Sequence, residues 1–263
     1  MDLTAAVKEF TLNQGVSVVG ISVPERFEGA PKGHHPLDWV PRAKSIVTFG
    51  MAMLELICEW ENMMKESELV PAEHRNEILQ NYVYRASAYD VVNDQLTFIG
   101  LKLANFLEAQ GHRSFYLPAT WGHAYEAQSS KVPGGRGLFS QRHAAVRAGL
   151  GEFGLNNVVV NPKHGPRIRW NSVITEAPLA PDPMLTEKSC LGDSCRLCVD
   201  QCPGAITLRD DYDPDAVWYN TPARTDIPTC RDIRKQVYCY GRCVRTCPVG
   251  KRGAPSSLTA AFL

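Results

Sequence analysis

The sequence lacks the features that would take the chain into or across a membrane. Its first residues, MDLTAAVKEFTLNQG, carry neither the basic start nor the apolar run of a signal peptide, and no apolar stretch reaches the roughly 18 residues that cross a bilayer. Net charge is absent too, because Lys plus Arg and Asp plus Glu number 28 each. A chain without an overall field does not point to nucleic acid or a membrane surface as a partner. We therefore expect a cytoplasmic protein that binds neither.

Cysteine is scarce in most of the chain. Cys58 stands alone in the first 189 residues, in the apolar stretch ELICEW, and we expect it to be a buried core thiol. The other eight cysteines lie between positions 190 and 247. In a reducing compartment, cysteines gathered in this way indicate metal ligands or redox groups rather than disulfides.

Before these cysteines, apolar spacing predicts a mixture of helices and strands. Gly15 and Gly111 are expected to end helices, and the region from about 52 to 110 is helical in pattern with an interruption near Pro71. The predicted strands are 16–23, 45–50, RSFYLPA, NNVVVNP and RIRWNSVITEA. The helices of the 52–110 region should cover one face of the resulting sheet. We expect an α/β (α+β) fold for residues 1–185 and a separate small domain for residues 186–263.

The eight clustered cysteines form two runs of four, and each run ends in Cys-Pro. The first run is Cys190, Cys195, Cys198 and Cys202, and the second is Cys230, Cys239, Cys243 and Cys247. Three spaced thiolates followed by Cys-Pro bind a 4Fe-4S cluster, and in two-cluster ferredoxins the fourth cysteine of each run ligates the other cluster. This crossover rule assigns Cys190, Cys195, Cys198 and Cys247 to one cluster, and Cys202, Cys230, Cys239 and Cys243 to the other.

Structural zinc is the alternative, since all-cysteine zinc sites also use pairs of close cysteines. The repeated Cys-Pro ending favours iron-sulfur clusters. Insertions widen the spacing after Cys190, after Cys230 and after Cys239, where two intervening residues are usual. Cys190 and Cys230 therefore depart furthest from the usual pattern.

Three parts of the chain resemble, in this order, the superfamily of epoxyqueuosine reductases and corrinoid reductive dehalogenases. They are VVGISVPERFEGAPKGHHPLDWVPRAKSIVTFG, AAVRAGLGEFGLNNVVVNPKHGPRIRWNSVITEAPL and the double cysteine module. The resemblance implies a nitroreductase-like domain over 1–185 that binds a base-off corrinoid (cobalamin), and a ferredoxin-like domain with two 4Fe-4S clusters over 186–263. It implies an enzyme whose clusters reduce cobalt to Co(I), which then acts on a small electrophilic substrate. An external donor such as ferredoxin or flavodoxin would supply the electrons.

The chain departs from epoxyqueuosine reductases at three places. The neighbourhood of their acidic residue reads VPGGRGLF here, without a carboxylate, and the GK that follows their AGLG segment is Gly154-Leu155. The sequence has 16 residues after Cys247, and we expect it to lack their helical-repeat extension. A twin-arginine signal, as in exported dehalogenases, is absent as well. We expect the redox scaffold with an altered substrate pocket, and no reduction of a modified tRNA base.

By resemblance, the candidates for binding the corrinoid lie within the RAGLGEFGLNN stretch: Gly149, Leu150, Gly151, Phe153, Gly154 and Asn156. The alternative is that Gly149 and Gly151 only end a short helix, QRHAAVRAGLG, that Ser140 caps. The polar groups near this stretch that could donate a proton are Tyr125, Arg142 and His143. They can equally be a loop aromatic, a salt-bridge partner and a helix-surface residue.

Two classes of function remain open. The first is a corrinoid-dependent iron-sulfur reductase with its own small-molecule substrate. The second is an electron-transfer protein that passes electrons to a partner, for example to reactivate the corrinoid of another enzyme. A flavin (FMN) in the nitroreductase-like pocket is a third, weaker alternative.

If both cysteine groups bind clusters, purified protein should contain about eight iron atoms and eight acid-labile sulfides per chain, and its broad brown absorbance should bleach on reduction. Iron and sulfide analysis of anaerobically prepared protein is the measurement. Stoichiometric zinc without sulfide would contradict the assignment.

Overall fold

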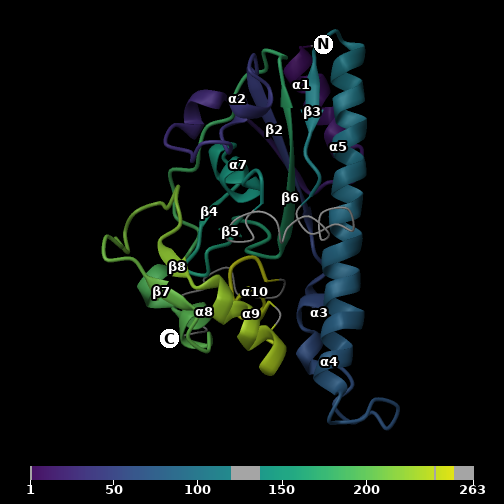
Figure 1. The fold of residues 1–263 in the computed structure, drawn as a ribbon, viewed down its shortest axis with the longest axis vertical. Coiled ribbons are helices and arrows are strands. Elements are labelled where there is room, and N and C mark those ends of the chain that lie inside the picture. The colour runs from purple at the N-terminus through teal and green to yellow at the C-terminus, as the bar shows by residue number, and fades with distance from the viewer. Residues whose placement is uncertain (1, 120–136, 240, 252–263) are drawn as a thin grey trace. The chain divides into compact units, whose positions relative to one another are not determined.

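The computed structural model describes residues 2–119, 137–239 and 241–251, and they form two compact units. Both units are built from separate stretches of the chain (Figure 1). Unit 1 comprises Met1–Ala52, Val92–Gly151 and Arg169–Thr186, and unit 2 comprises Met53–Val91, Glu152–Ile168 and Glu187–Leu263. The domain boundary expected between residues 185 and 186 lies one residue before the point, Thr186 to Glu187, where the chain last passes from unit 1 to unit 2. Two earlier segments, 53–91 and 152–168, also belong to the unit of the cysteine-rich tail. A division of the chain into two contiguous domains would assign them to the first domain instead.

A four-stranded sheet forms the centre of unit 1. Its strands, in spatial order, are β1 (Val18–Ser22), β2 (Ser45–Ala52), β6 (Ile168–Thr175) and β3 (Ser114–Tyr116). β1 pairs antiparallel with β2, and β3 pairs antiparallel with β6. The predicted strands at 16–23 and 45–50, and those in RSFYLPA and RIRWNSVITEA, are confirmed.

Helices cover both faces of this sheet. Successive side chains of a strand point to opposite faces, and here both sets are apolar and belong to two separate cores. Val47 and Val173 belong to one core, together with side chains of α1 (Leu3–Leu12) and α5 (Val91–Ala109). Ile46 and Ile174 belong to the other, which includes Ala144 of α7 (Gln141–Arg147). Figure 1 shows α5 as the long helix beside β3 and β6. Helix α5, from the predicted helical region, covers one face as expected, and α7 covers the other. Short helices η1 (Pro24–Phe27) and α2 (Pro36–Trp39) occupy the connection between β1 and β2.

The predicted helical region from 52 to 110 is broken more extensively than a single interruption at Pro71. Its elements are α3 (Glu55–Cys58), η2 (Trp60–Asn62), α4 (Arg75–Leu79), the π-helical η3 (Gln80–Asp90) and α5. The first four belong to unit 2, where Trp60, Leu79 and Tyr84 form a core with Cys58. Cys58 is 1% exposed, and burial raises the pKa of its thiol to about 11, so its prediction as a core thiol is confirmed.

The rest of unit 2 consists of short elements around the cysteines. They are β4 (Glu152–Phe153), β5 (Val159–Val160), η5 (Gly192–Ser194), α8 (Leu197–Asp200), β7 (Ile206–Leu208), β8 (Ala223–Thr225), α9 (Ile227–Gln236) and α10 (Arg242–Arg245). β4 pairs with β5, and β7 pairs with β8. The strand predicted across NNVVVNP is shorter than expected because Asn157 takes a left-handed conformation (φ 59°). Its N–H bonds to Gly154 O, which makes the turn of a hairpin.

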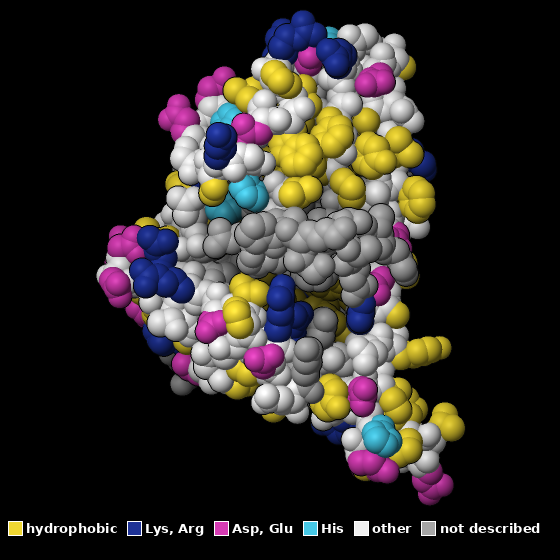
Figure 2. Space-filling view, in the orientation of Figure 1, with side chains coloured by type: hydrophobic (Ala, Val, Ile, Leu, Met, Phe, Trp, Pro, Cys, Tyr) yellow, Lys and Arg dark blue, Asp and Glu magenta, His cyan; other side chains and the backbone are white. Residues whose placement is uncertain are grey.

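The molecular surface carries both signs of charge. On the face shown in Figure 2, Lys and Arg side chains lie among Asp and Glu. Pairs such as Arg42–Glu176 (3.1 Å) and Arg209–Asp211 (2.7 Å) join them. No helix in the parts of the chain that the structure describes is long and apolar enough to cross a membrane.

Glycines in left-handed conformations follow α1, α5 and α7 of unit 1, and the surroundings of the first and the last of them differ. Gly15 (φ +89°) follows α1 and donates its N–H to Leu12 O, and a Cβ atom there would meet nothing within 4 Å. Gly149 (φ +72°) follows α7 and donates to Val146 O, and a Cβ atom there would lie 2.0 Å from Pro183 O. Gly149 is therefore required by close backbone packing as well as by its φ angle.

This contrast predicts two different losses of stability. Gly15→Ala should lower the free energy of unfolding by about 1 kcal/mol, the cost of a left-handed alanine, while Gly149→Ala should cost clearly more because Pro183 must also move. Chemical denaturation of the two variants beside wild type is the measurement. Equal losses would show that the contact with Pro183 is relieved without cost.

Candidate functional site

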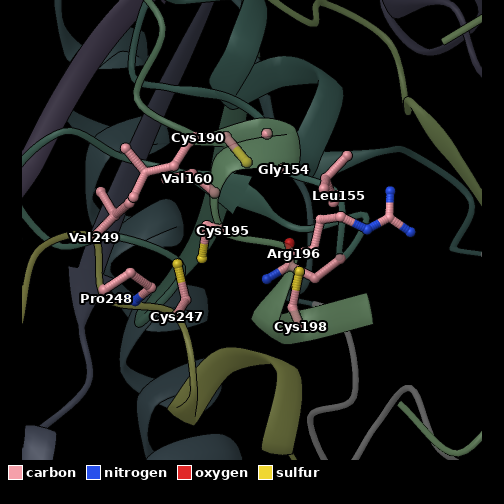
Figure 3. Close-up of a pocket in the computed structure, with 13 residues that line it drawn as sticks. Gly154, Leu155, Val160, Cys190, Cys195, Arg196, Cys198, Cys247, Pro248 and Val249 are labelled. Atoms are coloured by element: carbon pink, nitrogen blue, oxygen red, sulfur yellow. The ribbon is translucent and has the colours of Figure 1, made fainter. Parts of the chain in front are cut away.

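Four of the cysteines line one cavity in unit 2. Cys190, Cys195 and Cys198 of the first run meet Cys247 of the second run around it, and their sulfur atoms face the same space (Figure 3). The cavity measures about 340 Å³, counting the part that is open to solvent. Much of the remaining wall is aliphatic, with Leu155, Val160, Pro248 and Val249. We call these four cysteines the first cysteine group. It is the set that the crossover rule assembles, and its binding of a cluster stays a prediction.

Backbone turns absorb the wide spacing between Cys190 and Cys195. The inserted residues form the 3-10 turn η5, with Gly192 at φ +56°, and Arg196 (φ 48°) also takes a left-handed conformation. Cys195 N–H bonds back to Gly192 O at 3.2 Å. The chain therefore doubles back after Cys190, which brings Cys195 to the same cavity.

The other four cysteines also influence one another. Burial, and after it the charges of Cys239, Cys230 and Cys202, raise the pKa of Cys243 to about 12. Burial likewise raises the pKa of Cys239, and both Cys202 and Cys230 add to that rise. We call Cys202, Cys230, Cys239 and Cys243 the second cysteine group. The inserted residues between Cys230 and Cys239 extend helix α9, and Tyr238 (φ 49°) then turns the chain toward Cys239.

Both cysteine groups suit a multinuclear cluster. Burial raises the pKa of Cys198, and nearby thiolates, led by Cys190 and Cys247, raise it further. Crowded buried thiolates are stable only beside positive charge, and bound metal supplies such charge. Across residues 2–119, 137–239 and 241–251, no three His, Cys, Asp or Glu side chains converge closely enough for a single metal ion. In a 4Fe-4S cluster each thiolate binds a different iron, so its ligands surround a volume rather than a point.

The six corrinoid-binding candidates are divided between the two units. Gly149, Leu150 and Gly151 belong to unit 1, and Gly151 is buried. In unit 2, Gly154 and Asn156 line the cavity of the first cysteine group, and Asn156 Nδ2 donates to Cys243 O at 3.1 Å. Phe153, also of unit 2, is fully buried, and its N–H bonds to Trp218 O at 2.8 Å. Contact of these residues with a corrinoid stays a prediction.

The three proton-donor candidates have different positions. Tyr125 lies outside the described residues. Arg142 is exposed on α7, whereas His143 is partly buried there. Ser140 caps α7 as expected, since its Oγ accepts the His143 N–H, and the same Oγ lies 2.6 Å from His143 Nδ1. Burial, and after it the charges of Arg147 and Arg142, lower the pKa of His143 to about 4. At neutral pH this imidazole is uncharged, so it is a weak general acid.

The sequence prediction missed two buried charged residues beside the cysteines. Glu152 is 0% exposed and Arg167 is 3% exposed, and both contact the backbone of cysteine-bearing loops. Their signal in the sequence was weak: each is a charged side chain at a position flanked by Gly, Pro or apolar residues, in GLGEFGL and GPRIRW.

Comparison of sequences relates the chain to two kinds of reductase. No protein-family profile matches it. It is 24% identical to an epoxyqueuosine reductase of Bacillus subtilis over 81% of this chain and 49% of that protein. It is 42% identical to a tetrachloroethene reductive dehalogenase of Desulfitobacterium hafniense over 27% of this chain and 13% of that protein. The chain thus spans about half the length, or less, of these curated relatives.

Solved structures show the same relationship at the level of the fold. A selenomethionine-labelled epoxyqueuosine reductase matches with a TM-score of 0.63 and 20% identity, over 94% of this chain and 65% of that one. A catabolic reductive dehalogenase in complex with 3-bromo-4-hydroxybenzoic acid matches with a TM-score of 0.61 and 18% identity, over 94% and 32%. An epoxyqueuosine reductase with a modified tRNA stem loop matches with a TM-score of 0.51 and 21% identity, over 76% and 52%. The predicted fold class and the resemblance to this superfamily are confirmed.

The crossover between the runs predicts a selective effect of Cys202→Ser. Iron content should fall from about eight to about four atoms per chain, because the second cysteine group loses a ligand and the first keeps all of its own. Iron analysis together with electron paramagnetic resonance of the reduced protein is the measurement. Cys58→Ala, which removes the core thiol, should keep both clusters. Loss of the cluster held by Cys190, Cys195 and Cys198 in the Cys202 variant would contradict the wiring.

Proposed function

We propose that this chain is an iron-sulfur oxidoreductase that passes electrons from two 4Fe-4S clusters to a cobalamin-type corrinoid, which reduces a small substrate. One observation carries the proposal: Cys190, Cys195 and Cys198 of the first run line one cavity together with Cys247 of the second run. The named relatives support it, because they are reductases of two kinds that share this fold. An FMN gains no support from the matches described above.

The chain's own residues would divide the work. The first and second cysteine groups hold the clusters, which supply electrons one at a time, and the corrinoid supplies a low-valent cobalt centre. Gly149, Gly151 and their neighbours would admit the corrinoid, since residues without a side chain let backbone amides approach a large planar ligand. An external donor such as ferredoxin or flavodoxin would reload the clusters.

The second candidate function is electron transfer to a partner, such as a corrinoid protein that must be reactivated, without substrate chemistry in this chain. The state of His143 favours it, because a pKa of about 4 leaves no protonated imidazole to act as an acid at neutral pH. The tRNA stem loop bound by one matched structure keeps nucleic acid open as a partner, contrary to the expectation drawn from net charge.

Cobalamin binding separates the two functions. After anaerobic reconstitution of the clusters, titration with cobalamin should change the visible spectrum of the wild-type protein, with saturation near one corrinoid per chain if the pocket exists. Gly151→Leu should abolish this change, because a bulky side chain at this buried position would fill the space that the ring requires, while the iron content and helical circular dichroism stay as in wild type.

Gly151→Ala is the matched control, because its single methyl group should weaken cobalamin binding less than leucine does. Saturable binding that Gly151→Leu does not affect would place the corrinoid elsewhere. If wild type binds no cobalamin, the reductase proposal is wrong and the electron-transfer function takes its place.

A further inference from the structure

The segment 152–168 of unit 2 carries two buried charges of opposite sign. Glu152 opens it in β4 and Arg167 stands near its end, and they are 0% and 3% exposed. Removing an ion from water costs several kcal/mol unless other groups compensate it. For both residues, the hydrogen bonds recorded in the structure are to backbone groups, and they include the backbone of Cys190 or of Cys247 in the first cysteine group.

Glu152 holds the start of the first cysteine run. Its Oε1 accepts N–H bonds from Ser189 (2.5 Å) and Cys190 (2.7 Å), and its Oε2 accepts the N–H of Trp218 (3.1 Å). Both oxygens accept, which is the hydrogen-bonding pattern of a carboxylate. The amide proton of Cys190 is therefore directed to Glu152 and not to a sulfur atom in the cavity.

Arg167 holds the end of the second run. Its Nη1 donates to Val244 O (3.2 Å) and Cys247 O (2.8 Å), and its Nη2 donates to Val249 O. These carbonyl groups belong to α10 and to the Cys-Pro turn that follows it. A Cβ atom at Gly165 would lie 1.9 Å from Val249 O, so the backbone itself closes tightly on this turn. The guanidinium thus fixes the segment that brings Cys247 to the cavity.

These two charges act on the first cysteine group in opposite directions. Glu152 Oε1 lies 2.7 Å from Cys190 N, and Arg167 Nη1 lies 2.8 Å from Cys247 O, so a negative and a positive charge each stand beside a cysteine of this group. The reduction potential of an iron-sulfur cluster depends on nearby charge and on hydrogen bonds to its sulfur atoms. Glu152 adds negative charge and withholds an N–H donor, and both effects favour the oxidised cluster. Arg167 adds positive charge, which favours the reduced cluster.

We infer that Glu152 and Arg167 are a pair of positioning residues that hold Cys190 and Cys247 in the first cysteine group and set the reduction potential of its cluster in opposite directions. The inference rests on the proposed function, since it requires that these cysteines bind a cluster.

Reduction potentials of single variants test the inference. Glu152→Gln should raise the midpoint potential of one cluster, so that at a fixed potential the ratio of reduced to oxidised cluster rises at least tenfold, which is 59 mV for a one-electron couple. The midpoint of the other cluster should stay as in wild type. Redox titration followed by electron paramagnetic resonance, with iron analysis of every sample, measures both. Asp210→Asn is the matched control, because it removes a carboxylate from the same unit at a side chain that is 97% exposed, and it should shift neither midpoint.

Two variants of Arg167 test the other sign. Arg167→Gln should lower the midpoint potential of the same cluster whose potential Glu152→Gln raises. Arg167→Lys, which keeps the positive charge, should have a midpoint potential close to that of wild type. If Glu152→Gln loses this cluster, so that iron falls to about four atoms per chain, its positioning role is supported and the two Arg167 variants decide the electrostatic one. Equal midpoints in those two variants would overturn that role.

Failure of the inference is distinguishable from failure of the proposed function. Wild-type protein with about eight iron atoms, together with Glu152→Gln protein of unchanged iron content and unchanged midpoints, would overturn the inference alone. Wild-type protein without iron and sulfide would overturn the proposed function and the inference with it.

Discussion

The cost of ionising buried cysteines beside one another is the constraint on which the cysteine groups of unit 2 depend. Each cysteine group places four sulfur atoms within electrostatic reach of one another, and burial raises the pKa of Cys198, Cys243 and Cys247. Such groups stay together as thiolates only when positive charge lies among them. In the proposed function, iron supplies that charge. The short helices and left-handed turns of unit 2 would then depend on the clusters for much of their stability.

The segment 152–168 links this constraint to the rest of the chain. It leaves unit 1 after Gly151, forms the β4–β5 hairpin, and returns to unit 1 at Arg169. Along the way it contributes Glu152, Gly154, Asn156 and Arg167 to the surroundings of the cysteines. The sequence just after the RAGLG stretch thus serves the cysteine groups, while the glycines of RAGLG itself belong to unit 1. One continuous motif therefore has two structural roles.

Unit 1 supplies a rigid sheet whose hydrophobic faces are both covered. Beneath α7, Gln141 Nε2 donates to Asn171 Oδ1 at 3.0 Å, and Asn171 Nδ2 donates to Leu96 O at 3.0 Å, so polar groups tie α7 and α5 to β6. The position of α7 is therefore determined by buried hydrogen bonds as well as by apolar packing. His143 is partly buried on this helix, and its ring lies beside Ser140, which caps the helix, so it has a structural role there.

The sequence by itself determined the elements whose cause is local. Apolar strands such as 16–23, the cap at Ser140 and the helix ends at Gly15 and Gly111 follow from side-chain pattern and backbone freedom, and the structure has them. The cysteine spacing was equally informative, because two runs of four cysteines that each end in Cys-Pro are typical of iron-sulfur proteins. Only the tertiary structure decided that 53–91 and 152–168 fold with the cysteines, and that Glu152 and Arg167 reach their backbone. These features join residues dozens of positions apart, and no local periodicity encodes such contacts, because they arise when the chain buries its charges against distant backbone groups.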